Sequence, residues 1–367
     1  MKRAFVSDES TCYVALTNGR ATDTHLKIEE NIPLAPLTTL KIGGPARYFV
    51  RAETESDIVE ALEFASGKKV EVFVLGGGSN ILVADAGYDG LVVQIAMKGV
   101  AYDPFDESTR VTAMAGEDWD LLVKSCVNSG LAGIECMSGI PGSVGGTPVQ
   151  NVGAYGQEVA ETIESVRCLD RLTGQIVELP NPQCGFTYRT SIFNSAERGR
   201  YIVVSVAYRL RQGGAAKVVY NDLIERFDGD EPTLHEVRTA VLEIRRAKSM
   251  VIDASDPNSQ SAGSFFKNPV ITEGLLEDLR ARFPKVPSFV FGDGYKLPAA
   301  WLIENAGFRK GYRLGNAGIS TNHTLAIVNT GGATARDVIA LKDVIQTRVL
   351  AEFGIAIQPE PIFVGFE

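Results

Sequence analysis

Apolar and polar positions along the 367-residue chain alternate in some stretches and follow helical spacing in others. Alternating or continuous apolar runs predict strands at residues 46–51, 70–75, 111–115, 163–170, 176–179, 201–210 and 324–329. Apolar residues three and four positions apart predict helices at residues 54–67, 118–128, 233–248, 272–283, 298–303 and 335–353. The chain ends on a strand-like stretch, and no internal repeat interrupts this order.

Capping signals support the ends of several predicted helices. Thr54 is followed three residues later by Asp57, and Thr233 by Glu236, which is the spacing of a capping box. Gly354 stands where the last helix is predicted to stop.

A glycine-rich turn follows a strand–helix–strand pattern near the N-terminus. The strand at 70–75 leads directly into the sequence GGGSN at 76–80, a position that suits phosphate binding. The Rossmann pattern GxGxxG requires a third glycine, and this chain has Ile81 there. Residues 81–95 instead predict two short strands around a turn. The glycine turn therefore forms either a nucleotide cradle of another kind or a simple hairpin turn.

A second glycine-rich stretch, residues 136–156, has neither a helix nor a strand period. Its sequence is CMSGIPGSVGGTPVQNVGAYG. Glycines let backbone N–H groups approach a ligand closely, and successive amides form an anion-binding concavity. Composition alone also fits a surface loop, but Ile140, Val144 and Val149 would have no purpose in a solvated linker. We interpret the stretch as a cofactor-lining loop.

Composition and charge narrow the class of protein. Hydrophobic residues make up 45% of the chain and charged residues 22%, as in ordinary globular proteins, and the formal net charge is −9. This acidity argues against nucleic acid and anionic membranes as partners. Five scattered cysteines fit reduced thiols better than a disulfide framework, and three dispersed histidines predict no metal site. The first thirty residues lack the apolar core of a secretory signal, so we expect a cytoplasmic N-terminal extension.

Seven motifs in a fixed order resemble those of the UDP-N-acetylenolpyruvoylglucosamine reductase family, flavoenzymes of peptidoglycan precursor synthesis. Each motif is weak alone, whereas the ordered set is specific and spans almost everything after residue 30. The motifs are LTTLKIGGPA (37–46), LGGGSN (75–80), GIPGSVGGTPVQNVGAYG (139–156), YRTSIF (188–193), SAGSFFKNP (261–269), WLIENAG (301–307) and PEP (359–361).

The resemblance implies an α+β fold with an FAD-binding domain of the vanillyl-alcohol oxidase (PCMH) type in two lobes, plus a smaller α/β substrate-binding domain. The expected division is an N-terminal extension at 1–30, lobe 1 at 31–98, lobe 2 at 99–249 with the C-terminal strand at 354–367, and the substrate-binding domain at 250–353. The polar, turn-rich stretch 250–260 supports the last boundary from the residues themselves.

The activity that the resemblance implies is NADPH-dependent, FAD-mediated reduction of UDP-N-acetylenolpyruvoylglucosamine to UDP-N-acetylmuramate. Hydride from the reduced flavin goes to one alkene carbon, and a proton goes to its neighbour. One alternative is an FAD-dependent oxidase or dehydrogenase of the same fold that acts on another small substrate. Such enzymes often tether the flavin through His or Cys, and neither glycine loop contains a histidine. Another alternative is a flavin- or nucleotide-binding module that lacks the catalytic residues.

The resemblance assigns a non-covalent FAD to the two glycine loops and to one arginine, with NADPH as co-substrate. The expected FAD contacts are Gly76, Gly77, Gly78, Ser79, Asn80, Gly139, Ile140, Pro141, Gly142, Ser143, Gly146, Thr147, Gly153, Ala154 and Arg245.

Three residues carry the expected chemistry. Arg189 in YRTS can hold a carboxylate through two N–H groups, and alone it would fit a surface salt bridge. Glu360 lies between two prolines, and beside a substrate carboxylate its pKa should rise so that it can donate a proton; alone it would fit an exposed terminal charge. The resemblance assigns Ser264 as the general acid, whereas most serines in such a setting only cap a turn.

Five further residues are expected to bind the sugar nucleotide: Tyr155, Tyr220, Lys248, Asn268 and Asn322. Tyr220 resembles the tyrosine of a flap loop found in one class of the family, and on the residues alone it fits a core aromatic on a strand equally well. We expect a cytoplasmic, monomeric enzyme that acts on small molecules, with no metal, nucleic acid or membrane partner.

Overall fold

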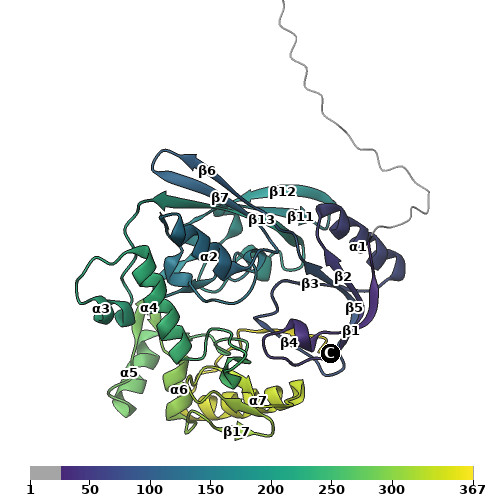
Figure 1. Ribbon diagram of the computed structural model, residues 1–367. Helices are drawn as coiled ribbons and strands as arrows, with labels where there is room; N and C mark the ends of the chain where they lie inside the picture. Colours follow the sequence, from purple (N-terminus) through teal and green to yellow (C-terminus); the bar gives the residue numbers. More distant parts are fainter. Residues whose placement is uncertain (1–25, 367) are drawn as a thin grey trace, which may run out of the picture.

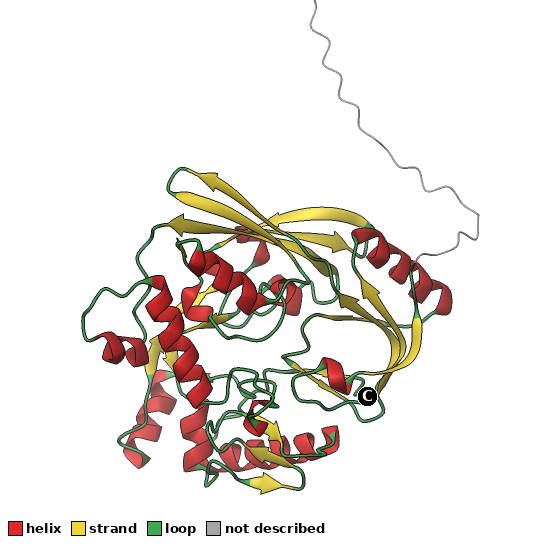
Figure 2. Cartoon of the chain, in the orientation of Figure 1, coloured by secondary structure: helices red, strands yellow, loops and turns green. Residues whose placement is uncertain are grey.

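The computed structural model describes residues 26–366. Figure 1 shows two β-sheets that curve over a third, more helical part of the molecule, and Figure 2 shows that long loops fill the region between them. Most of the predicted extension at 1–30 lies outside the described residues. Its last two positions, Glu29 and Glu30, begin strand β1 (Glu29–Pro33).

The first sheet contains the predicted strand–helix–strand unit. Its strands lie in the order β1-β2-β5-β3, and both β2 and β3 run parallel to β5. Helix α1 connects β2 to β3 and begins at the predicted capping box of Thr54 with Asp57. The prediction is confirmed, with β5 inserted between the two strands. The elements are β2 (Pro45–Ala52), α1 (Glu55–Lys68), β3 (Val72–Leu75) and β5 (Tyr88–Ile95).

The second sheet is antiparallel and has the strand order β12-β11-β13-β7-β6, with β8 paired to β13. Helix α2 packs beneath it, where the Trp119 ring lies 5.8 Å from the Tyr208 ring of β13. Both sheets contribute to one hydrophobic cluster, so the two predicted lobes share a core. The elements are β6 (Val100–Phe105), β7 (Ser108–Met114), α2 (Trp119–Asn128), β8 (Leu131–Ala132), β11 (Ile163–Asp170), β12 (Gln175–Pro180), β13 (Tyr201–Gln212), α3 (Asn221–Phe227) and α4 (Leu234–Ala247).

The third part has its own hydrophobic core, built on helices α5, α6 and α7 and two small three-stranded sheets. Leu40, Ile42 and Leu82 from the N-terminal part join this core, so the parts are packed against each other. The elements are β14 (Val270–Ile271), α5 (Glu273–Arg282), β15 (Phe289–Phe291), β16 (Gly294–Lys296), α6 (Ala299–Asn305), β17 (Arg313–Leu314), β18 (Ala317–Ile319), β19 (Ile327–Asn329) and α7 (Ala335–Phe353). The division at residue 250 stays a prediction.

The C-terminal strand was predicted to join lobe 2, and this placement is wrong. Strand β20 (Ile362–Val364) pairs in parallel with β4 (Ile81–Val83), which lies within residues 31–98. Strand β4 belongs to a different sheet from β5, so it has a free edge for β20, and Val83 and Val364 are buried in one cluster. The two strands predicted at 81–95 therefore exist, but they do not pair with each other as a hairpin.

Short elements complete the described chain. The 3₁₀ helices are η1 (Ala35–Leu37), η2 (Glu135–Met137), η3 (Val144–Gly146), η4 (Val159–Glu161), η5 (Asn181–Cys184), η6 (Ile192–Asn194) and η7 (Pro257–Ser259), and a two-stranded hairpin consists of β9 (Gly153–Ala154) and β10 (Gln157–Glu158). Four cysteines of the described part are buried and free. Within residues 26–366, no helix is both long and apolar enough to cross a membrane.

Candidate active site

The two glycine-rich loops lie against each other. Ser79 Oγ, in the loop that follows β3, donates a hydrogen bond of 3.0 Å to the carbonyl oxygen of Pro141 in the second loop. A Cβ atom on Gly77 would lie 2.6 Å from Gly142 Cα, and one on Gly76 would lie 2.8 Å from Ser143 Oγ. Backbone contact this close requires glycine at 77, whereas at 76 the near atom is the end of a serine side chain. GGGSN is therefore part of a two-loop cradle and not a hairpin turn.

The second loop is held from behind by helix α2 and β13. Gly139 N donates to Asp120 Oδ1 at 2.6 Å, and Trp119 N donates to the Gly142 carbonyl oxygen at 3.1 Å. The Thr147 and Tyr208 hydroxyl oxygens are 2.7 Å apart. Val144 is fully buried. The interpretation as a solvated surface loop is excluded, because Val144 is buried and the loop is hydrogen-bonded to α2 and β13.

Arg245 and the open side of the loops fit an FAD. Arg245 is 7% exposed, and its Nε has no hydrogen-bond partner among the described residues. Burial lowers the pKa of its guanidinium, although Tyr155 and Asp120 oppose this effect. A buried cation with a free donor calls for an acceptor from a ligand. A Cβ on Gly139 would lie 3.4 Å from that Nε, and a Cβ on Gly146 would meet nothing within 4 Å.

Arg189 and Glu360 meet at the junction of the N- and C-terminal parts. Arg189 Nε lies 3.4 Å from Glu360 Oε1. Arg189 adopts a left-handed backbone with φ 54°, which a non-glycine residue rarely takes up without a functional or packing reason. Burial raises the pKa of the Glu360 carboxyl, and the nearby Arg189 and Lys267 oppose part of that rise. Neither residue is an ordinary exposed charge.

Three of the sequence motifs converge to place Glu360. The Glu360 N–H donates to the Phe265 carbonyl oxygen at 2.9 Å, so the PEP segment pairs with the SAGSFFKNP segment. Asn80 Nδ2 donates to Gln150 Oε1 at 2.6 Å, and Asn80 O accepts from the N–H of Ile362 at 3.0 Å. Both glycine loops and the C-terminal segment are thereby connected.

Ser264 directly precedes Phe265 in this pairing and is partly exposed. Its hydroxyl makes no hydrogen bond within the described part of the chain, so it is free to donate to a ligand there. The structure thus brings the segments of Arg189, Glu360 and Ser264 together.

Four of the five predicted substrate residues gather at the C-terminal end of α4. The Tyr155 and Tyr220 rings lie 5.3 Å apart, edge to face. Lys248 Nζ donates to Asp222 Oδ2 at 2.9 Å, and Asn322 Nδ2 donates to the neighbouring Ser249 at 2.8 Å. Tyr220 is 44% exposed and precedes the first residue of α3. The interpretation of Tyr220 as a core aromatic on a strand is therefore wrong.

Asn268 lies apart from that group. Its Oδ1 accepts the N–H of Ala299 at 2.9 Å, at the beginning of α6. Gly153 and Ala154, predicted to bind FAD, form strand β9 of the hairpin that carries Tyr155 at its turn. Tyr155 has φ 49° and Gly156 φ 84°, the left-handed pair that a tight two-residue hairpin turn needs.

Several functional positions were not predicted. The charge of Lys267 opposes the rise in the pKa of Glu360, Asp222 pairs with Lys248, and Asp120 supports Gly139. Lys267 stands next to the predicted Asn268 within a motif, and Asp222 lies two residues after the predicted Tyr220, which could have drawn attention to them. Asp120 has no comparable signal, because its arginine partner Arg238 lies 118 residues further along the chain.

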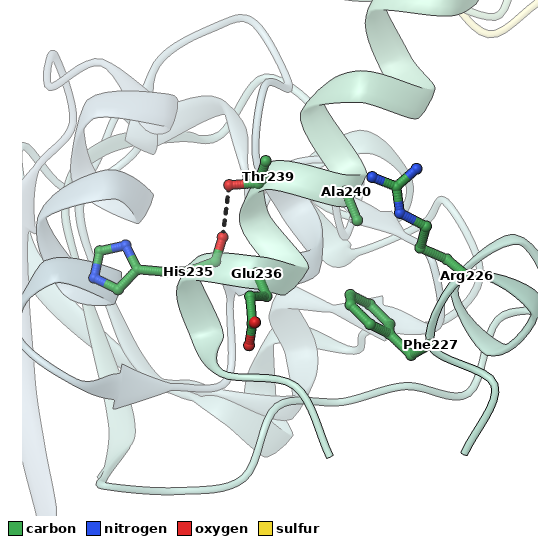
Figure 3. A pocket seen from close by; sticks show the side chains of 6 residues that line it. All are labelled: Arg226, Phe227, His235, Glu236, Thr239 and Ala240. Carbon is green, nitrogen blue, oxygen red and sulfur yellow. Dashed lines mark hydrogen bonds between the residues drawn. The ribbon is translucent and has the colours of Figure 1, made fainter. Parts of the chain in front are cut away.

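A surface hollow between α3 and α4 contains none of the predicted site residues (Figure 3). It is lined by Arg226, Phe227, His235, Glu236, Thr239 and Ala240. Its residues on α4 come from the N-terminal half of that helix, whereas Arg245 and Lys248 lie at the other end. The candidate site residues therefore lie away from this hollow.

Comparison with known proteins agrees with this geometry. Residues 46–180 match the family described as FAD binding domain, and residues 256–364 match the C-terminal domain of UDP-N-acetylenolpyruvoylglucosamine reductase. The UDP-N-acetylenolpyruvoylglucosamine reductase of Thermobifida fusca is 42% identical over 91% of this chain and 97% of its own length. That of Saccharopolyspora erythraea is 44% identical over 90% and 94%. The crystal structure of the Thermus caldophilus reductase has a TM-score of 0.64 and 27% identity, and covers 92% of this chain and 99% of the other.

An FAD-binding fold whose two glycine loops face an arginine–carboxylate pair defines an FAD-dependent oxidoreductase. With the similarity to these relatives over nine-tenths of its length, the chain belongs to the UDP-N-acetylenolpyruvoylglucosamine reductase family. The predicted family and fold class are confirmed.

Proposed function

We propose that the chain reduces UDP-N-acetylenolpyruvoylglucosamine to UDP-N-acetylmuramate, with FAD as cofactor and NADPH as reductant, in peptidoglycan precursor synthesis. The observation that carries this proposal is the meeting of Arg189, Glu360 and the Ser264 segment beside the two glycine loops. An oxidase of the same fold would have no need for this group of residues. We also propose a cytoplasmic location and a monomeric state.

Different residues stabilise the developing negative charge and supply the proton. Bound FAD supplies the hydride. Arg189 binds the enolpyruvyl carboxylate and stabilises the negative charge that develops on it. Glu360, whose carboxyl pKa burial raises, donates a hydrogen bond to the same group in its protonated form. Ser264 delivers the proton to the alkene carbon next to the one that receives the hydride. Lys248 and the two tyrosines bind the sugar nucleotide.

Two spectra test the proposed function. Purified protein should be yellow and should bleach when NADPH is added without oxygen. Anaerobic UDP-N-acetylenolpyruvoylglucosamine should then restore the colour. A protein that bleaches but is reoxidised only by other acceptors would be an oxidase or dehydrogenase of the same fold, and a protein that never bleaches would not be a reductase.

The flavin should be held without a covalent bond. No histidine lies in either glycine loop, and Cys136, the first residue of the second loop, is fully buried. Burial also raises the pKa of its thiol, which suppresses the reactive thiolate. Acid precipitation should therefore release all flavin as FAD into the supernatant. Flavin that sediments with the protein would contradict this prediction.

Tyr220 should act on sugar-nucleotide binding alone. Its side chain is 44% exposed and its ring packs edge-on against Tyr155. The Gly213–Ala216 break precedes it, so we propose that it lies on a flap that closes over the ligand. Tyr220→Phe should raise KM for the sugar nucleotide by about tenfold through one lost hydrogen bond. Flavin reduction by NADPH should be unchanged. Tyr102→Phe on β6 is the matched control. Equal losses in both half-reactions would contradict the flap.

A further inference from the structure

Glu135 is a fully buried carboxylate to which none of the roles above is assigned. It is 0% exposed and lies on η2, just before the second glycine loop. Its Oε2 accepts the N–H of Gly133 at 2.7 Å. Its Oε1 accepts Gln157 Nε2 at 2.8 Å and the backbone N–H of Lys217 at 2.9 Å. No lysine or arginine side chain forms an ion pair with it in the described part of the chain, so these three N–H groups compensate its charge.

Two of the three donors belong to the segments that carry the site tyrosines. Gln157 begins strand β10, directly after the hairpin turn of Tyr155, and its Oε1 accepts the N–H of Cys136 at 2.8 Å. Lys217 lies just before Tyr220, and its carbonyl oxygen accepts Cys136 Sγ at 3.1 Å. Consecutive residues of η2 therefore hold both segments.

Lys217 is the anchor of the stretch that precedes Tyr220. Residues 214–219 form no helix or strand. Among these described residues, Lys217 is the one whose backbone N–H and carbonyl groups are hydrogen-bonded. Val219 then packs on the hairpin turn, because a Cβ on Gly156 would lie 2.4 Å from Val219 Cγ2. After Tyr220, α3 packs on α4 through the buried Leu223, beside the hollow of Figure 3. The stretch is thus fixed by Glu135 at one end and by α4 at the other.

We infer that Glu135 is a positioning residue for the sugar nucleotide: its carboxylate ties the Tyr155 hairpin and the Lys217 backbone to the flavin loop, so that Tyr155 and Tyr220 meet over the ligand. The inference rests on the proposed function, because it assigns these tyrosines to the sugar nucleotide.

A glutamine at 135 tests the tie with almost no change in volume. A carboxylate can accept all three N–H groups, whereas an amide accepts on one side and donates on the other. In Glu135→Gln, at least one N–H group must face another donor, and the contact is lost. A flap that is correctly placed only about a tenth of the time weakens binding about tenfold.

The experiment measures anchoring and binding separately. Hydrogen exchange followed by mass spectrometry should show faster exchange of the Lys217 amide in Glu135→Gln. Titration of the oxidised holoenzyme with UDP-N-acetylenolpyruvoylglucosamine, followed by flavin absorbance, should give a Kd raised about tenfold, while kcat at saturation stays within about twofold. Combined with Tyr220→Phe, the effects on Kd should be less than additive, because both act through the flap.

The control is Glu161→Gln, which removes the surface ion pair with Lys217 Nζ and leaves the backbone anchor intact. It should change neither exchange nor Kd. If Glu135→Gln fails to retain FAD, Lys217→Pro replaces it, since it removes the anchoring N–H group together with the Glu161 ion pair, whose own effect Glu161→Gln measures. A Kd unchanged despite faster exchange, or strictly additive effects on Kd, would overturn the inference. A wild-type protein that does not bind the sugar nucleotide at all would instead refute the proposed function.

Discussion

Ser264→Ala is expected to slow reoxidation of the reduced enzyme by the enolpyruvyl substrate by at least about a hundredfold, because general-acid catalysis contributes roughly 10²–10⁴-fold. This corresponds to about 3–5 kcal/mol of barrier. A serine hydroxyl is a weak acid and can protonate only a strongly basic partner, such as the α-carbon of the enolate. Its free hydroxyl stands one residue before Phe265, the residue that fixes Glu360 in place.

The two half-reactions distinguish loss of the proton from loss of the fold. FAD content and reduction by NADPH should survive in Ser264→Ala, because neither uses that proton. Ser264→Cys should recover part of the rate, since a thiol also donates. Ser288→Ala, which removes only a surface hydrogen bond from Arg280, is the matched control. Stopped-flow reoxidation of Ser264→Ala at the wild-type rate would leave Ser264 as a turn residue.

Local signals in the sequence predicted most elements, because their causes are local. The capping boxes at Thr54 and Thr233 are present, and helix α7 has its predicted bounds. Strand β6 was not predicted, because all its residues are exposed and an apolar pattern needs a buried face. The partner of β20 was not predictable from pattern either, since three apolar residues do not specify which free strand edge they will join.

The candidate site also combines features that local sequence patterns predict with features that depend on long-range contacts. Motifs identified Arg189 and Glu360, but only the fold shows that Arg189 takes a left-handed backbone and that the two side chains meet. Glu135 lies directly before residues 136–156, a stretch with no periodic signal. Its burial is possible only because Gly133, Gln157 and Lys217 bring three N–H groups to it, and Lys217 lies 82 residues away in sequence. A local sequence pattern cannot predict that distant N–H groups will compensate a buried charge in this way.

Glu360 is predicted to act as a neutral hydrogen-bond donor, and its removal should have the second large effect. Glu360→Ala should slow reoxidation by roughly 10²–10³-fold, the usual cost of losing one donor to a developing negative charge. Glu360→Gln should be less impaired than Glu360→Ala, because an amide still donates an N–H group. Reduction by NADPH serves as the internal control, and a Glu360→Ala variant that reoxidises normally would contradict the role.

The pH dependence follows from the surroundings of Glu360. Burial raises the pKa of its carboxyl, while Arg189 from the 187–190 turn and Lys267 from the paired segment pull it back. At a pH between the unfolded and folded pKa values, the folded protein therefore still binds a proton that the unfolded chain has released. Stability associated with the neutral carboxyl is fully present below the unfolded pKa and is lost as the pH rises through the folded pKa.

Two measurements test this predicted loss of the neutral carboxyl as the pH rises. In the wild type, the reoxidation rate should fall as the pH rises through the folded pKa of Glu360, since the donor becomes an acceptor; in Glu360→Gln this fall should be absent. Urea unfolding should show Glu360→Gln gaining stability relative to the wild type over the same rise in pH, because the amide cannot ionise. If the rate of Glu360→Gln falls with pH as in the wild type, the titrating group is another residue, and Glu360 holds the substrate as an anion through Arg189 alone.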